Sequence, residues 1–141
     1  MKKLLVVLLI CSAMACKKDQ DATLTKNDWL IESATVSPAM TSGGKTSTNY
    51  IELMGPSSCV ATTTLSFSDN GTFSSGSNGA LCDLMSTGAR TVTWRRDGDQ
   101  VFLSTAPDSP LTLKGKKLTQ IVKVTEPGGS QYTFTYVYKA K

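Results

Sequence analysis

Short glycine-containing turns recur along the second half of this 141-residue chain, and they constrain its fold more than any other feature. Between the turns, apolar and polar residues alternate with a period of two, which is typical of β-strands that bury one face. A correct hairpin register must place the apolar residues of both strands on the same face, so each turn can be tested. The alternation therefore predicts a series of antiparallel hairpins.

Four turns satisfy this test, and they lie at Asp69-Asn70-Gly71, Asp97-Gly98, Gly115-Lys116 and Pro127-Gly128-Gly129. The first of them requires Gly71 in the left-handed conformation, which glycine adopts at little cost. The four registers predict these cross-strand pairs: Phe67 with Phe73, Trp94 with Val101, Val92 with Leu103, Leu113 with Leu118, Leu118 with Tyr138, Gln120 with Tyr136, Val122 with Phe134, and Val124 with Tyr132.

The alternation is less regular before the first of these turns. It predicts strands over Trp29–Ser37 and Asn49–Leu53, joined by a loose stretch over Pro38–Thr48, and a short helical turn over Leu24–Asp28. In total we expect about eight strands in an all-β antiparallel meander. Such a meander either curls into a small barrel or, as the alternative, folds over as an open β-sandwich.

The first 15 residues are typical of an export signal. Lys2 and Lys3 precede the apolar run Leu4–Ile10, which is too short to span a bilayer as a helix. Together with the small residues around Cys16, the segment resembles a bacterial lipoprotein signal. That resemblance implies cleavage before Cys16 and acylation of its thiol by chains such as palmitate. Acylation at Cys11 and export without lipidation are the alternatives.

The polar residues 16–23 are expected to form a tether between the acylated cysteine and a folded domain over residues 24–141. Their Lys/Asp-rich sequence is similar to the signals that send Bacteroidetes lipoproteins to the outer face of the outer membrane. The similarity implies exposure at the cell surface, with the periplasmic face as the alternative. Loss of Lys2 and Lys3 leaves 13 basic against 11 acidic residues, a net charge of +2 that gives no basis for nucleic-acid binding.

Cysteine usage predicts one disulfide. Cys59 and Cys82 are the only cysteines beyond residue 16, and in an oxidising compartment two such thiols most simply pair. A free buried pair and a metal site are the alternatives. Because the chain has no histidine, two cysteines are too few ligands for zinc. We therefore expect neither a metal site nor a cofactor.

No motif in the chain predicts catalysis. Ala39–Thr46 matches a relaxed phosphate-binding loop, but no strand-loop-helix pattern surrounds it, so nucleotide binding is not expected. Asp97 and Asp99 lie in an exposed turn, which suits neither for acid–base work. The absence of histidine removes imidazole general bases as well. We expect a protein that is not an enzyme.

Several segments together resemble the lipocalin-like lipoproteins of Bacteroidetes. They are the export signal with its cysteine, the first-strand Trp29, the hairpin from Phe67 to Phe73, the Thr-Trp strand at Trp94 and a closing aromatic strand. The resemblance implies a small up-and-down barrel that holds small apolar molecules. It also implies that Trp29 plugs the closed end of the barrel, with Lys139 over its ring as a cation–π partner.

Aromatic residues gather on one face of the last strand. This row contains Tyr132, Phe134, Tyr136 and Tyr138, and Gln120 and Trp94 are expected on neighbouring inner faces. One interpretation is simple core packing, since an eight-stranded barrel is just wide enough for its own side chains to fill it. The other is a ligand-binding pocket wall formed by Trp94, Gln120, Phe134, Tyr136 and Tyr138.

We therefore expect a lipid-anchored, monomeric envelope protein that binds a small hydrophobic ligand without catalysis. The alternative is an interaction module with a fully packed core, whose outer face meets a protein or a glycan. The membrane is a partner through the anchor in both cases.

Overall fold

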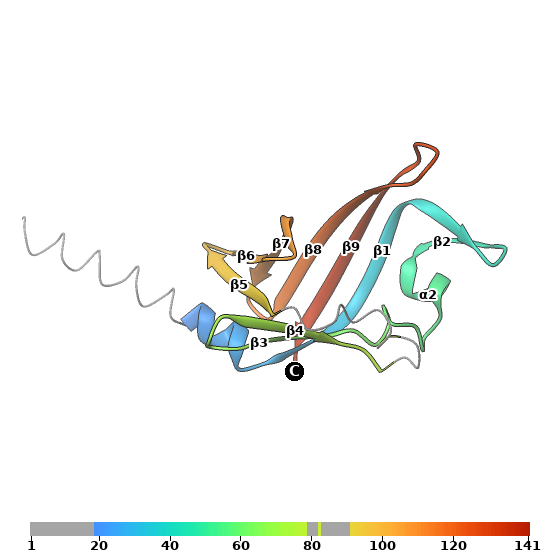
Figure 1. Cartoon of the computed structure of the whole chain (residues 1–141). Coiled ribbons are helices and arrows are strands. Elements are labelled where there is room, and N and C mark those ends of the chain that lie inside the picture. The colour runs from blue at the N-terminus through green and yellow to red at the C-terminus, as the bar shows by residue number, and fades with distance from the viewer. Residues whose placement is uncertain (1–18, 79–81, 83–90) are drawn as a thin grey trace, which may run out of the picture.

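The computed structural model describes residues 19–78, 82 and 91–141, and Cys16 and the expected signal lie outside them. Residues 19–25 form an N-terminal helix, and a second short helix is α2 (Tyr50–Met54). The remaining elements are strands (Figure 1): β1 (Asp28–Ser42), β2 (Lys45–Asn49), β3 (Thr64–Phe67), β4 (Thr72–Gly76), β5 (Val92–Asp97), β6 (Gln100–Leu103), β7 (Ala106–Lys114), β8 (Lys117–Thr125) and β9 (Gln131–Ala140).

All pairings in the sheet are antiparallel, and from β3 to β9 each strand pairs with the next in the chain. β1 pairs with β3 on one side and with β9 on the other, so eight strands close into a barrel. β2 is an additional strand that pairs only with the second half of β1. The prediction of an all-β antiparallel barrel is confirmed, and the open-sandwich alternative is wrong.

Three of the four predicted hairpin registers are confirmed. Phe67 pairs with Phe73 across a turn in which Gly71 has a φ of 81°. Leu113 pairs with Leu118, and every predicted pair between β8 and β9 occurs, from Leu118 with Tyr138 to Val124 with Tyr132. Turn chemistry and hydrophobic pattern act together in these hairpins, which is why they could be read from local sequence.

The predicted register of the β5–β6 hairpin is wrong by two residues. Its loop is Gly98-Asp99, so Trp94 pairs with Leu103 and not with Val101, which pairs with Arg96. Val92, predicted opposite Leu103, pairs with Phe73 of β4 instead. A slip of two residues leaves the same side chains on the inner face, so the hydrophobic pattern alone cannot detect it.

The segments before β3 differ from expectation. The stretch predicted to be loose is a hairpin, because β1 continues to Ser42 and turns at two glycines with positive φ into β2. The strand predicted over Asn49–Leu53 is helix α2. The Asn49 side chain accepts a hydrogen bond from the Glu52 backbone N–H at 3.2 Å and so caps that helix. The helical turn predicted over residues 24–28 ends at residue 25 and begins within the expected tether.

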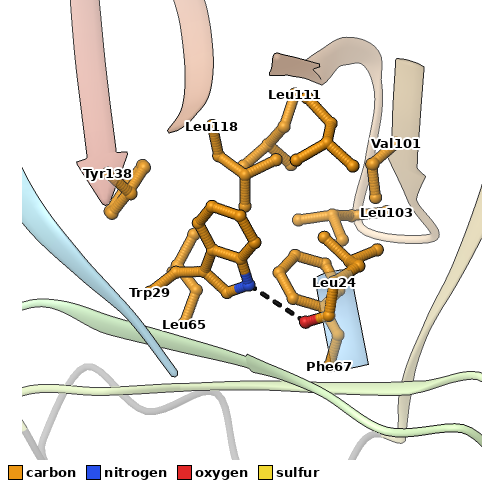
Figure 2. Close-up of a cluster of buried hydrophobic side chains, with 10 residues drawn as sticks. Leu24, Trp29, Leu65, Phe67, Val101, Leu103, Leu111, Leu118 and Tyr138 are labelled. Atoms are coloured by element: carbon orange, nitrogen blue, oxygen red, sulfur yellow. Dashed lines mark hydrogen bonds between the residues drawn. The ribbon is translucent and has the colours of Figure 1, made fainter. Parts of the chain in front are cut away.

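A buried cluster fills the end of the barrel at which β1 begins and β9 ends, which we call the closed end. Trp29 lies at its centre with no solvent exposure, and its indole N–H donates to the Leu24 carbonyl at 3.0 Å (Figure 2). The N-terminal helix thus lies against the core through Leu24, which is also fully buried. The cluster contains Leu24, Trp29, Leu65, Phe67, Val101, Leu103, Leu111, Leu113, Leu118 and Tyr138.

The cation–π contact expected at Trp29 does not form. Lys139 pairs with Leu30, whereas Trp29 pairs with Ala140, so Lys139 faces the opposite side of the sheet. The Leu24 carbonyl is the polar partner of the indole instead.

The predicted disulfide is confirmed. Cys59 and Cys82 are bonded with their Cα atoms 5.5 Å apart, just beyond the last pair of the β3–β4 ladder, Thr64 with Gly76. The Ser77 hydroxyl donates to the Cys59 carbonyl at 3.1 Å and ties the same two segments together. The disulfide therefore fastens the base of the β3–β4 hairpin.

Candidate functional site

Three strands extend beyond the rest of the barrel. Pairing between β7 and β8 ends at Leu111 with Gln120, whereas β8 stays paired with β9 as far as Thr125 with Gln131. The far part of β9 pairs in turn with β1, up to Ser37 with Thr133. Figure 1 shows this three-stranded extension rising away from the C-terminus, with β2 and α2 beside β1. We call it the open end.

Aromatic rings line the inner side of the open end. The rings of Phe134 and Tyr136 are stacked with centroids 6.2 Å apart, and Tyr132 lies 6.5 Å from Phe134. Tyr50, the first residue of α2, meets Phe134 edge-on at 4.9 Å. Phe134 is buried, while the three tyrosines are partly exposed. We call Tyr50, Tyr132, Phe134 and Tyr136 the aromatic face.

Aliphatic side chains from the two neighbouring strands continue this surface. Val36 of β1 pairs with Phe134 and is buried beneath the aromatic face. On β8, Val122 and Val124 pair with Phe134 and Tyr132, and Val124 is 41% exposed. The surface is thus apolar and aromatic, with part of it open to solvent.

Polar groups at this surface are few. The Gln120 side chain lies opposite Tyr136. Its amide donates to the Ser109 carbonyl of β7 at 3.0 Å, so it already has a hydrogen-bond partner within the barrel. Among the described residues, no group forms a hydrogen bond with the hydroxyls of Tyr50, Tyr132 or Tyr136. These hydroxyls are the polar groups that remain for a ligand.

Burial raises the pKa of Tyr136 to about 12, with the nearby Tyr50 as a smaller cause, and burial also raises the pKa of Tyr138. In both cases the folded protein retains a proton that the unfolded chain loses above pH 10. The stability that this provides is fully present below pH 10 and is lost as the pH rises through the folded-state values. We expect alkaline titration of phenolate absorbance to show a late phase that shrinks in Tyr136→Phe; an unchanged late phase would contradict the burial of this ring.

The five residues predicted to form one pocket wall extend over two regions of the barrel interior, and Tyr136 and Trp94 both pack against the buried cluster. Phe134 and Tyr136 are in the aromatic face, with Gln120 next to it. Tyr138 belongs to the buried cluster at the closed end. Trp94 packs against Phe67 at 5.8 Å and donates its indole N–H to the Ser68 carbonyl at 3.0 Å.

Sequence reasoning missed Tyr50 because it placed this residue in a strand. The available signal was Asn49 followed by Glu52 three positions later, which is a helix N-terminus pattern. The side chain of Glu52 also accepts hydrogen bonds from Lys45 and Ser47, and the bond to Lys45 is the main cause that lowers the pKa of Glu52. These contacts hold α2 where its first residue reaches β9.

A shallow pocket of about 180 Å³ lies against β5 and β6. It shares only Trp94 with the predicted pocket wall. The Arg95 guanidinium lies over the Phe102 ring at 4.0 Å and forms part of its lining, together with Pro107. The pocket is therefore separate from the aromatic face.

A buried cation joins the N-terminal helix to the barrel. The side chain of Arg96 faces inward and is only 3% exposed. Its Nε donates to the Asp21 carboxylate at 2.5 Å and its guanidinium also donates to the Gln20 side chain at 2.7 Å and to the Gly98 carbonyl. These bonds connect the β5–β6 hairpin to the N-terminal helix.

Removal of the Asp21 carboxylate should destabilise the folded protein. Asp21→Ala removes a carboxylate that accepts from a buried guanidinium, so we expect a loss of about 1–3 kcal/mol in the free energy of unfolding. Asp108→Ala, at an exposed carboxylate on β7, serves as the control and should change stability by less than about 0.5 kcal/mol. Equal effects of the two variants in urea unfolding would argue against the Arg96–Asp21 contact.

No protein-family model, no curated protein and no solved structure matches this chain. Within residues 19–78, 82 and 91–141, no three potential ligand side chains gather as a metal site, and no helix is long and apolar enough to cross a bilayer. The choice of the aromatic face as the candidate functional site therefore depends on the geometry of its side chains.

Proposed function

We propose that this protein is a lipid-anchored envelope protein that binds a small, mainly apolar ligand without catalysis. The observation that carries the proposal is the aromatic face: stacked and edge-on rings beside exposed Val124, with tyrosine hydroxyls that have no partner among the described residues. Ligand sites typically combine such an apolar lining with a few polar groups that orient the ligand.

The ligand class follows from the chemistry of this surface. Flat aromatic rings and valine side chains favour an apolar body, and phenol groups favour one or two hydroxyl or carbonyl groups on it. No charged side chain belongs to the aromatic face, so it offers no counter-ion to a strongly charged ligand.

Binding of a fluorescent anilinonaphthalene probe tests the position of the site. We expect Tyr132→Ala to weaken binding about fivefold, because one aromatic contact contributes on the order of 1 kcal/mol. Ile121→Ala is the matched control. It removes an exposed apolar side chain from β8, one residue from Val122 and therefore on the opposite face of the sheet. Weakening by Ile121→Ala equal to that by Tyr132→Ala would show that the probe binds elsewhere.

The anchor at Cys16 is a separate part of the proposal, and it rests on the lipoprotein-type signal in the sequence. A metabolic fatty-acid probe should label the protein in cells, and Cys16→Ser should abolish the label. Persistence of the label in Cys16→Ser would assign the acyl group to another residue. Protease added to intact cells distinguishes the cell surface, which we propose, from the periplasmic face.

A second candidate is supported by the filling of the closed end. Ten buried residues, centred on Trp29, occupy the interior there. A barrel packed in this way suits an interaction module whose outer face binds a protein or a glycan. Under that hypothesis the probe has no specific site, and both Tyr132→Ala and Ile121→Ala leave its binding unchanged.

A further inference from the structure

We propose that the closed end of the barrel docks on an anionic membrane surface through a cluster of lysines, so that the aromatic face points away from the bilayer. The inference rests on the anchor at Cys16 in the proposed function. It adds an orientation and a lipid-binding surface to that anchor.

Few residues would separate an anchor at Cys16 from the barrel. The N-terminal helix begins by Asp19, three residues after Cys16, and three extended residues span about 11 Å at most. From residue 20 onward the chain is attached to the barrel: Gln20 and Asp21 bond Arg96, and Leu24 is buried against Trp29. An acylated Cys16 would therefore hold the closed end against the membrane.

Lysines gather at this same end. Lys114 of β7 pairs with Lys117 of β8, and Lys117 pairs with Lys139 of β9, so three lysines lie side by side on the outer face. The Ala140 N–H donates to the Lys116 carbonyl at 3.1 Å, which brings the β7–β8 turn beside the end of β9. We call Lys114, Lys116, Lys117, Lys139 and Lys141 the basic edge, and all five are exposed.

Few carboxylates neutralise the basic edge. Glu32 bonds Lys117 at 2.8 Å, and this bond is the main cause that lowers the pKa of Glu32, with Lys139 also contributing. Like charges directly opposite each other in a sheet are unfavourable. They are tolerated where an anionic partner lies close, and juxtamembrane lysines are attracted to acidic lipid headgroups.

Acidic residues occupy the other turns of the closed end. Asp69 lies in the β3–β4 turn, and Asp97 and Asp99 lie at the β5–β6 turn. Apart from Glu32 and from Asp28, whose backbone carbonyl accepts from the Lys141 N–H at 2.9 Å, these acidic residues lie away from the basic edge. The basic edge, on the side of β7, β8 and β9, is the side that should tilt toward an anionic surface.

Lysine footprinting of the acylated full-length mature protein tests the orientation. The protein is placed in vesicles of phosphatidylcholine alone or of phosphatidylcholine with phosphatidylglycerol, and treated with a membrane-impermeant amine reagent. Exposed Lys45 on β2 and Lys123 on β8 lie on elements of the open end and serve as internal references. We expect phosphatidylglycerol to reduce labelling of the basic edge about fivefold relative to these references. High salt should reverse the protection.

The outcomes separate the two proposals. Equal labelling in both vesicles, or protection of Lys45 and Lys123 instead, overturns the docking surface. A mature N-terminal peptide whose mass shows no acyl chain overturns the anchor, and the docking inference falls with it. Acylated protein without protection of the basic edge leaves the anchor intact and refutes only the orientation. The variant Lys114→Gln/Lys116→Gln, still acylated, should lose part of the protection at Lys117 and Lys139.

Discussion

Trp29→Ala should reduce the free energy of unfolding by roughly 3–5 kcal/mol, the range observed when a buried tryptophan is truncated. Trp29 has no solvent exposure and lies at the centre of the closed-end cluster. The substitution also leaves the Leu24 carbonyl without its indole donor. Since small domains are typically stable by only about 5–15 kcal/mol, this single change removes a large part of the total.

Trp94→Ala is the matched control, because Trp94 is the only other tryptophan in the chain and is partly exposed. It also donates its indole N–H to a backbone carbonyl, so the two variants lose a similar hydrogen bond and differ mainly in burial. Urea unfolding followed by circular dichroism compares them. A loss in Trp29→Ala no larger than that in Trp94→Ala would contradict a core centred on Trp29.

Replacement of both Cys59 and Cys82 by serine should cost about 3 kcal/mol, because the bond closes a loop with a sequence separation of 23 residues in the unfolded chain. The hydrogen bonds from Ser77 and between Thr62 and Ser77 span the same two segments and remain in the variant. The hairpin should therefore persist while the unfolding midpoint falls.

A reducing agent provides the control for this prediction. It should lower the urea midpoint of the unsubstituted protein to a value near that of the double variant, and it should leave the double variant unchanged. A midpoint of the unsubstituted protein that does not respond to reduction would show that the disulfide does not contribute to stability.

The hairpins that could be predicted are those in which local information was sufficient. At Gly71 and at Gly115, a glycine with positive φ and an apolar pair on the flanking strands determine the same register. At Gly98 the same signals permit two registers that differ by two residues. Both registers place Trp94 and Arg96 on the same face, so the hydrophobic pattern does not distinguish them.

Helix α2 shows a second limit. Tyr50 begins a run of residues that suits a strand, yet the Asn49 cap and the Glu52 contacts favour a helix there. Local hydrogen bonds of this kind compete with sheet pairing. The position of Tyr50 against Phe134 then follows from the β1–β2 hairpin, which the sequence pattern did not predict.

The candidate site could be predicted in part. A period of two places Phe134, Tyr136 and Tyr138 on one face, and the structure confirms that they share it. The period-two alternation does not predict how far each neighbouring strand extends. Because β7 stops pairing at Gln120, Tyr138 is covered by the core, Tyr136 lies at the edge of that core opposite Gln120, and Phe134 lies on the extension.

Native mass spectrometry of the acylated protein, purified from its own membranes and paired with lipid extraction, tests whether the protein binds a small apolar ligand. We expect one mainly apolar small molecule per protein, at reduced occupancy in Tyr132→Ala and at full occupancy in Ile121→Ala. A protein that leaves its membranes without any such molecule, and that gains none when offered the extract, would contradict a ligand-binding role for the aromatic face.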